Sequence, residues 1–354
     1  MKHRHYNRIL ILIFCLLFAI VSGFMIWLEP YSGDLTRIGA FQENRYGWNQ
    51  HQKKFKSPHY KIGSNLNEYD SYFDIVTIGD SFSVNEFQSW QNYLSLSCNA
   101  SIITFHRRSV NITDLLKSNQ FKMTPPKLVI YEVVEHGIQT ALHDIDTGRK
   151  IDFNENENQI SLSFQNIDFS MLMESYEREK TNKFSMDTAI HYIKTNIKQI
   201  LGSRIKAIPK VIESKEMLFS NNHSDAVLFY HLDNLKESID SEEWEIIEQR
   251  FATAQALIEN NKKTRFLAMI APDKRTVYNH LLMNEKDGYK SALESMPGKS
   301  KINWVNTYKA LREMVEDGVV DIYLPNDIHW GYQGYKAAYL ATKEKIEELK
   351  NSRL

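Results

Sequence analysis

The feature that most limits what this chain can fold into is an uncharged apolar run near its N-terminus, residues 9–28. A run of about 20 apolar residues is the length that a helix needs to cross the hydrocarbon core of a bilayer. Trp27 lies near the outer end of the run, where indole rings favour the membrane interface, and Pro30 ends the helix. We therefore predict one transmembrane helix over residues 9–28.

The charges beside this run predict its orientation. Lys2, Arg4 and Arg8 precede it, and positive charge on that side favours a cytoplasmic N-terminus. Residues 1–8 would form a cytoplasmic tail, and the rest of the chain would lie in the periplasm or the extracellular space. A cleaved signal peptide is the alternative, although the run is long for one and no clear small-x-small cleavage site follows it.

Composition argues against several classes of protein. The 43 basic and 44 acidic residues give a net charge of −1 without blocks of like charge, which argues against a nucleic-acid-binding surface and a long disordered tail. Of the two cysteines, Cys15 lies inside the apolar run and Cys98 lies far along the chain, so we expect no disulfide. The sequence has no Cys-x-x-Cys pair, and we expect neither a metal nor another cofactor.

After the predicted anchor, the pattern of apolar and polar stretches indicates an α/β domain. Residues 31–70 are predicted to be a tether, and residues 71–350 to be the domain. Strands are predicted at residues 73–78, 100–105, 127–134, 265–270 and 319–324. Helical stretches separate them, which favours a parallel sheet with helices on both faces. Residues 140–235 interrupt this alternation and are interpreted as an insertion, with a loop or hairpin over 144–166 and helical character over 168–200.

Local signals mark the ends of helices in the second half of the domain. Asp240, followed three residues later by Glu243, forms a capping box that predicts the start of a helix. A further helix over residues 308–316 should end at Gly318, as a C′ glycine does. The final helix is predicted over residues 334–349.

The chemical pattern that stands out consists of Ser81, Asp327 and His329. Serine is a weak nucleophile until a base takes its proton, and the base needs a third group that fixes its tautomer. Ser81 follows the first predicted strand in a Gly-Asp-Ser turn, and His329 follows the last one, with Asp327 two residues before it. Each motif alone is weak, because these are common turn residues. In a parallel sheet, however, both loops emerge at the same edge, so the sequence predicts a Ser–His–Asp site.

These motifs, Gly-Asp-Ser-Phe-Ser at residues 79–83 and Asp-Ile-His-Trp at residues 327–330, resemble the first and last blocks of the SGNH (GDSL-like) hydrolase superfamily. Residues 128–136 resemble the strand and Glu-x-x-Glu segment of its alginate O-acetyltransferase type, and residues 271–278 resemble the Pro-Asp-Lys…Tyr segment of that group. The resemblance covers most of the predicted domain apart from the insertion. It implies a flavodoxin-like three-layer fold with a central parallel sheet, preceded by one transmembrane helix.

The sequence departs from this pattern in two respects. In the alginate proteins the Asp-x-His-Trp motif precedes the serine motif, whereas here it follows, as in ordinary SGNH hydrolases. The glycine and the asparagine that normally help to bind the oxyanion are missing, and residues 106–109 and 132–135 occupy their places. The backbone N–H of Ser81 is then the safest oxyanion donor, with Arg108 as another candidate.

Several further residues are candidates for oxyanion or substrate contacts, each with a plainer alternative. They are Asp80, Arg108, Glu132, Glu135, Lys274 and Trp330. The two glutamates are as readily a salt-bridged pair at a strand end, and Lys274 is more often a structural or solvated lysine. Trp330 would either stack on a sugar or shield the His–Asp pair from water.

The resemblance implies an O-acetyltransferase that works outside the membrane on a cell-surface or exported polysaccharide. A membrane-bound O-acyltransferase would deliver acetyl groups across the bilayer, Ser81 would carry the acetyl as an ester, and His329 would act as the general base. A glycan O-acetyl esterase would use the same triad with water as the acceptor. A non-catalytic glycan-binding or assembly role is the third interpretation, because the oxyanion-binding residues depart from the pattern.

Overall fold

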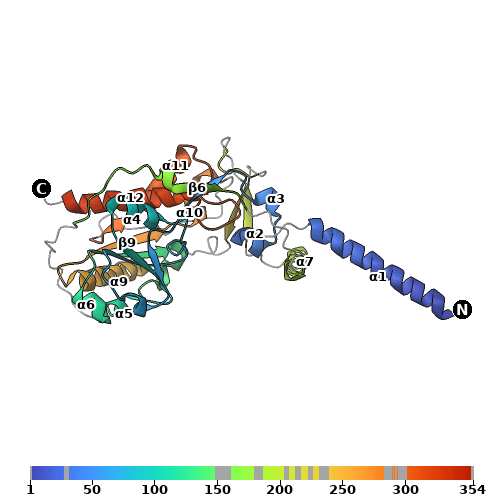
Figure 1. Ribbon diagram of the computed structural model, residues 1–354, viewed down its shortest axis with the longest axis horizontal. Coiled ribbons are helices and arrows are strands. Elements are labelled where there is room, and N and C mark those ends of the chain that lie inside the picture. Colours follow the sequence, from blue (N-terminus) through green and yellow to red (C-terminus); the bar gives the residue numbers. More distant parts are fainter. Residues whose placement is uncertain are drawn as a thin grey trace.

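The structure is a computed structural model that describes residues 2–27, 32–147, 161–178, 186–202, 207–211, 217–221, 226–230, 239–282, 289, 291, 293 and 301–351. Its first helix, α1 (Lys2–Trp27), projects away from the rest of the molecule (Figure 1). The segment His5–Gly23 has a mean hydropathy of 2.0, and none of it is buried. The predicted N-terminal helix is therefore present, and it is long and apolar enough to span a membrane.

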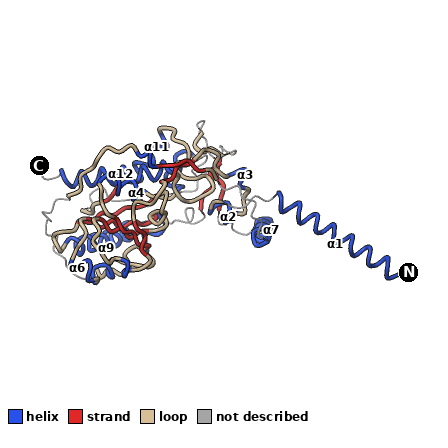
Figure 2. The backbone as a smooth tube through the Cα atoms, in the orientation of Figure 1, coloured by secondary structure: helices blue, strands red, loops and turns tan. Residues whose placement is uncertain are grey.

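The centre of the domain is a six-stranded parallel sheet with the strand order β10-β9-β5-β3-β4-β2. Figure 2 shows strands, in red, in the middle of the domain with helices around them. The strands are β2 (Lys61–Gly63), β3 (Ile75–Gly79), β4 (Ile102–His106), β5 (Leu128–Val134), β9 (Arg265–Ala271) and β10 (Trp304–Val305). Every residue of β3 and β5 is buried, as expected for apolar strands that are covered on both faces. The predicted α/β fold with a parallel sheet is confirmed.

Helices cover both faces of this sheet (Figure 1). One face carries α4 (Trp90–Cys98), α10 (Lys274–Tyr278), α11 (Thr307–Glu316) and α12 (Tyr332–Asn351). The other carries α5 (Ile112–Lys117), α6 (Asn119–Met123) and α9 (Ser241–Glu259). Along β5, Val129 belongs to one core and Ile130 to the other, because successive side chains of a strand point to opposite faces.

The predicted helix signals in the second half of the domain are confirmed. Asp240 accepts a hydrogen bond from the backbone N–H of Glu243, and the Glu243 side chain accepts one from that of Asp240, so the capping box starts α9. Just beyond α11, Gly318 has a φ of 73°, the left-handed conformation that glycine adopts most readily at a helix end.

The expected tether over residues 31–70 is wrong for its described part, which is folded into the domain. It forms α2 (Asp34–Gly39), α3 (Glu43–Tyr46), β1 (Gln52–Phe55) and β2. Leu35 and Phe55 are buried, and β2 pairs with β4 at the edge of the main sheet. The composition is polar because these strands are short and lie at sheet edges, where lysines are tolerated.

The predicted strand over residues 319–324 is also wrong. The position beside β9 is taken by β10, and residues 319–324 form turns with a single antiparallel bridge between Tyr323 and Trp330. Asp321 has a φ of 56°, which does not fit an extended strand. Ile322 and Tyr323 are nevertheless fully buried, which explains why the segment has the composition of a buried strand.

The insertion over residues 140–235 packs with the segment that follows α1. Its elements are β6 (Met173–Tyr176), α7 (Met186–Ile200), β7 (Ala207–Val211) and β8 (Ala226–Tyr230). β6 pairs with β1, and β7 pairs with β8 beside α2. Among the described residues of the range 168–200, helical structure is found in α7 and in a short 3-10 turn before β6. Most of the loop expected over residues 144–166 lies outside the described residues.

Candidate active site

Ser81 lies at the carboxyl edge of the sheet, in the turn that follows β3. The chain forms β4 on one side of β3 and β5 on the other, so this edge is a switch point of the topology, where α/β sheets bind their ligands. Ser81 is exposed, whereas Phe82 and Ser83 after it are buried. The turn therefore exposes Ser81 to solvent, while the residues that follow it are packed in the core.

A buried carboxyl group, Glu132 on β5, supports this turn. Its Oε2 accepts hydrogen bonds from the backbone N–H of Asp80 at 2.7 Å and from Oγ of Ser83 at 2.9 Å. A Cβ at Gly79 would overlap Glu132 and Ser83, so only glycine lets these two side chains lie so close to the backbone at residue 79. Burial, and then the charge of Asp80, raise the pKa of Glu132 to about 8. Burial therefore favours the protonated form of Glu132, whose Oε2 contacts the turn.

The side chain of Asp80 points back into the protein and joins the serine turn to two strands. Its Oδ1 accepts a hydrogen bond from Nε of Arg107 at 2.6 Å, and its Oδ2 accepts one from the backbone N–H of Val134 at 3.0 Å. The sequence favoured Arg108, which is exposed. The arginine that reaches the serine turn is its neighbour Arg107.

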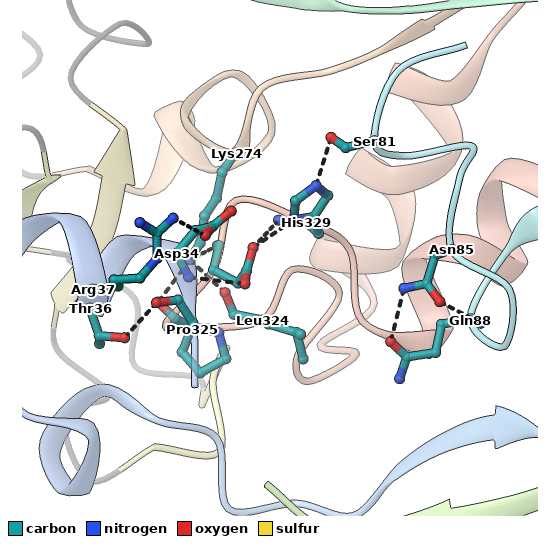
Figure 3. A network of polar contacts seen from close by, with 12 residues as sticks. Asp34, Thr36, Arg37, Ser81, Asn85, Gln88, Lys274, Leu324, Pro325 and His329 are labelled. Atoms are coloured by element: carbon teal, nitrogen blue, oxygen red, sulfur yellow. Dashed lines mark hydrogen bonds and ion pairs between the residues drawn. The ribbon is translucent and has the colours of Figure 1, made fainter. Parts of the chain in front are cut away.

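His329 bridges Ser81 and Asp327 (Figure 3). Its Nε2 lies 2.8 Å from Oγ of Ser81, and its Nδ1 lies 2.7 Å from Oδ1 of Asp327. The same carboxylate oxygen accepts the backbone N–H of His329 at 3.0 Å. A carboxylate at Nδ1 favours the tautomer in which Nε2 is free to accept the serine proton. The three residues predicted from the sequence thus lie within hydrogen-bond reach of one another.

Asp327 and His329 shift each other's pKa. Burial alone would raise the pKa of Asp327, but its hydrogen bonds with His329, the positive charge of that ring and the backbone N–H of Asp34 lower it to about 2. Burial lowers the pKa of His329, but the hydrogen bond and charge of Asp327 outweigh it, so the pKa is raised above 6.5. Asp327 therefore stays ionised at neutral pH and stabilises the imidazolium that forms when His329 takes a proton.

A buried lysine holds the loop that carries His329. Nζ of Lys274 lies 2.8 Å from the carbonyl oxygen of Leu324, 3.0 Å from that of Pro325 and 3.3 Å from that of Asp327 (Figure 3). Buried carbonyl groups need hydrogen-bond donors, and residues 325–329 lie in turns and bends rather than in a strand of the sheet. Lys274 is thus a structural donor to the histidine loop.

Glu135 fixes the start of α10, the helix whose first residue is this lysine. Its Oε2 accepts hydrogen bonds from the backbone N–H of Asp273 at 2.9 Å and from Oγ1 of Thr276 at 2.6 Å. Its Oε1 accepts one from Oγ of Ser291 at 2.9 Å. Glu135 is fully buried and makes no ion pair with Glu132, since both are acids. The two glutamates at the end of β5 support opposite halves of the site.

The segment that follows α1 closes the other side of the histidine loop. The backbone N–H of Asp34 donates to Oδ2 of Asp327 at 3.1 Å, and that of Leu35 donates to the carbonyl of Asn326 at 2.9 Å. A Cβ at Gly33 would overlap this carbonyl, so the contact requires glycine. We call residues 32–43, which make these contacts, the N-terminal clamp.

A fully buried glutamate, Glu43, completes this clamp. Its carboxylate accepts hydrogen bonds from the backbone N–H of Ser32 at 2.9 Å and from Nδ2 of Asn326 at 2.9 Å, and it pairs with Arg178 of the insertion at 3.3 Å. Three distant parts of the chain therefore meet behind the histidine loop. The clamp was not predicted from the sequence because it falls within the expected tether. Asn326, a polar residue next to the histidine motif, was the one signal that this loop could have a further partner.

Trp330 lies beneath the site and is buried. Its ring centroid lies 4.6 Å from that of Phe82 and 5.5 Å from that of Tyr335, and Phe82 in turn lies 4.9 Å from the ring of His329. Because Trp330 is only 1% exposed, its ring has no open face for a sugar. Its position fits the alternative role, which is to shield the His–Asp pair from water.

The backbone N–H of Ser81 is the available oxyanion donor among the candidates. It donates to no acceptor within the part of the chain that the structure describes. The carboxyl groups of Asp80, Glu132 and Glu135 accept hydrogen bonds from the protein, and Lys274 donates to loop carbonyls. One N–H of this kind typically contributes about 10²–10³ in rate to acyl transfer.

Asp34, Asp327 and His329 are the one group of three potential metal ligands that the described residues bring together. The Asp34 carboxylate already pairs with Arg37 at 2.5 Å, and the other two side chains bind each other. Protein contacts therefore account for all three side chains without an ion.

The arrangement as a whole suits nucleophilic attack on an ester carbonyl. The exposed hydroxyl of Ser81 lies beside a base whose tautomer is fixed by Asp327, and an N–H in the same turn faces no acceptor among the described residues. These are the parts that acyl transfer through a serine ester requires. No family model matches the sequence, and no curated protein and no solved structure matches it.

Proposed function

We propose that this protein is an extracytoplasmic O-acetyltransferase of the SGNH (GDSL-like) type that acts on a cell-surface or exported polysaccharide. The observation that carries the proposal is the position of His329, whose ring nitrogens lie 2.8 Å from Oγ of Ser81 and 2.7 Å from Oδ1 of Asp327. A serine that contacts a histidine, which in turn contacts an aspartate, is activated for attack on a carbonyl carbon.

The topology of the sheet supports the same type of fold. Taken in chain order, β3, β4, β5, β9 and β10 lie in the order 2-1-3-4-5, which is the order of flavodoxin-like sheets. β2 adds one strand at the edge. The serine motif follows the first of these five strands and the histidine motif follows the last, in agreement with the motif order of ordinary SGNH hydrolases.

The reaction proceeds in two half-reactions through one ester. Oγ of Ser81 attacks the acetyl carbonyl of the donor while Nε2 of His329 takes its proton, and the donor's leaving group departs with that proton. The product is acetyl-Ser81. A sugar hydroxyl then attacks this ester, His329 takes the hydroxyl proton, and the proton returns to Oγ of Ser81 as the acetylated sugar leaves.

The N-terminal helix supports a site held outside the membrane. α1 is long and apolar enough to span a bilayer, and Lys2, Arg4 and Arg8 at its start favour a cytoplasmic N-terminus. The domain then lies in the periplasm or the extracellular space, where activated acetyl donors of the cytoplasm are not available. A membrane-bound O-acyltransferase that passes acetyl groups across the bilayer is the partner that this location requires.

The proposal is tested with the full chain in detergent, supplied with p-nitrophenyl acetate and with oligosaccharides from exported bacterial polysaccharides. We expect the wild type to release p-nitrophenol and to acetylate an oligosaccharide, and Ser81→Ala to do neither. Mass spectrometry of the sugars separates transfer from hydrolysis. Equal activity of the two proteins would contradict the proposal.

A glycan O-acetyl esterase is the second candidate, and the exposure of Ser81 favours it. Because the serine is exposed, water can reach the acetyl-enzyme and compete with a sugar hydroxyl. Release of p-nitrophenol without any acetylated sugar, together with deacetylation of an acetylated glycan, would identify the esterase. The third interpretation, a non-catalytic glycan-binding role, gains weight if Ser81→Ala changes neither reaction.

A further inference from the structure

α7 carries a stripe of exposed aliphatic side chains. Ile190, Ile193, Ile197 and Ile200 have exposed fractions of 42%, 47%, 50% and 83%, and Leu201 directly after the helix is 76% exposed. At about 100° per residue, the four isoleucines fall within an arc of about 80° on one side of the helix. Single exposed apolar residues are ordinary on protein surfaces, but a continuous apolar patch marks an interaction surface.

The two sides of this stripe differ in character. On one side, Ala189 is buried and Tyr192 and Asn196 are half-buried, so this face packs on the protein. On the other side lie the exposed side chains of Lys194 and Lys198. An aliphatic stripe with lysines along its polar edge is the pattern of a helix that lies in the plane of a membrane interface, with its cations near lipid phosphates.

The position of α7 in the molecule brings this stripe close to α1. Nε2 of His191 lies 2.7 Å from the carbonyl oxygen of Arg37, so α7 is attached to α2. α2 begins at Asp34 and α1 ends at Trp27, and a chain segment of this length spans at most about 25 Å. Figure 1 shows α7 at the end of the domain from which α1 projects.

We infer that α7 is an interfacial helix, whose isoleucine stripe dips into the outer leaflet of the membrane that α1 crosses. This inference rests on the proposed membrane anchoring by α1. Lipid is the occupant that fits, because the stripe is aliphatic, lysines follow its edge, and the anchor leaves the bilayer nearby. Two attachments, α1 and α7, then fix the orientation of the domain. The N-terminal clamp, and with it the histidine loop, lies on the membrane side, close to an acetyl donor that leaves the bilayer.

The depth of α7 is measured with an environment-sensitive fluorophore on single cysteines of the full chain. The probed positions are I197C in the stripe and M123C on α6 as a control, both in a Cys15→Ser background. Met123 is 77% exposed, and α6, the helix that it ends, lies at the end of the domain away from α1 (Figure 1). The native Cys98 does not compete for the label, because its burial raises the pKa of its thiol to about 12.

The labelled proteins are placed in nanodiscs of phosphatidylethanolamine and phosphatidylglycerol that contain a doxyl-lipid quencher. A helix at this depth lies about 5–10 Å inside the interface, so the label at I197C should be quenched at least about threefold more than that at M123C. Its emission should also shift to the blue. Equal quenching at the two positions overturns the inference.

Two further arms separate the possible causes of failure. A label on Cys15 of the wild type reports on α1 alone: strong quenching there with no quenching at I197C overturns the interfacial helix and leaves the anchor intact. No quenching at Cys15 overturns the anchoring and the inference with it. If I197C is solvent-exposed in nanodiscs but shielded in native membranes, a membrane protein covers the stripe, and the lipid assignment is wrong.

Discussion

The serine half and the histidine half of the candidate site are built in different ways. Ser81 follows a central strand, and its turn is supported by the neighbouring strands through Glu132, Arg107 and Val134. His329 lies in a loop without a strand, and its supports come from α10, the N-terminal clamp and the insertion. A motif beside a strand is supported by the adjacent strands of the sheet, whereas a motif in an irregular loop depends on elements outside the sheet.

The largest effect is expected for Asp327, which belongs to the histidine half and directly contacts the proposed general base. Asp327→Asn should lower kcat by about 10⁴, because the amide stabilises the wrong imidazole tautomer. In the wild type, kcat/KM should fall as pH drops through the raised pKa of His329, since only neutral imidazole accepts the serine proton. In the variant this limb should move to lower pH. A pH series with p-nitrophenyl acetate measures both effects, and a loss below tenfold would contradict the triad.

A smaller effect is expected when the histidine loop loses its buried donor. Lys274→Met removes the ammonium group that binds three carbonyls of this loop. A displacement of the base by about 1 Å costs about 10² in rate, so kcat should fall by that factor. Lys309→Met, at an exposed lysine on α11, is the control and should leave kcat unchanged. If both variants match the wild type by kinetics and thermal unfolding, Lys274 does not position the loop.

The N-terminal clamp should contribute less to catalysis than Lys274 does. Removing one backbone hydrogen bond tests this prediction. Asp34→Pro removes the N–H that binds Asp327, at a first helical position where proline is tolerated. Gly33 before it is already extended, with φ −115° and ψ 154°, as a residue before proline must be. A hydrogen bond to a charged group contributes about 1.5–3 kcal/mol, so kcat/KM should fall about tenfold or more.

Asp34→Asn is the matched control for this prediction, since it retains the backbone N–H. The loss in Asp34→Pro should come with a higher apparent pKa of His329, because a carboxylate with one hydrogen bond fewer attracts the imidazole proton more strongly. The acid limb of kcat/KM should therefore move to higher pH. Equal rates and equal pH profiles in the two variants would show that the clamp is dispensable for the site.

The smallest effect on activity is expected in the serine half. Glu132→Gln keeps an oxygen that accepts from Asp80 and Ser83, so kcat at pH 7 should change by less than about threefold, since one neutral hydrogen bond is exchanged for another. Stability should respond to pH instead. The pKa of Glu132 is raised from 4.5 to about 8, so the folded state binds more protons and loses stability as pH rises from 4.5 through 8.

In Glu132→Gln this decline in the free energy of unfolding should be smaller. Urea unfolding at pH 5 and at pH 8.5 measures the difference between the two proteins. The same pH dependence in both would show that Glu132 is ionised in the fold.

The serine half and the sheet were predictable from the sequence because their signals are local. β3 and β5 are largely apolar, as strands covered on both faces are, and Ser81 lies in the turn after β3. Asp327 and His329 were predictable as a pair because two residues separate them, and a short loop brings their side chains together. In each case the signal that allowed the prediction lies within a few residues of the predicted feature.

The supports of the histidine half were not predictable, because their partners are distant in the sequence. Nothing near Glu43 indicates that it will be buried against Asn326 and Arg178. Residues 319–324 have the composition of a strand, yet the left-handed backbone of Asp321 turns them away from the sheet. The roles of Glu132 and Glu135 depend on which side of β5 each one meets, which composition does not reveal.

The most direct test of the central claim is to look for an acetyl ester on Ser81. The full chain is mixed with p-nitrophenyl acetate, quenched in acid within one turnover, digested and examined by peptide mass spectrometry. The triad predicts one acetyl group on the peptide that contains Ser81, its absence in Ser81→Ala, and its disappearance when an acceptor sugar is added before the quench. Release of p-nitrophenol at the wild-type rate by Ser81→Ala, or acetylation of another residue alone, would contradict it.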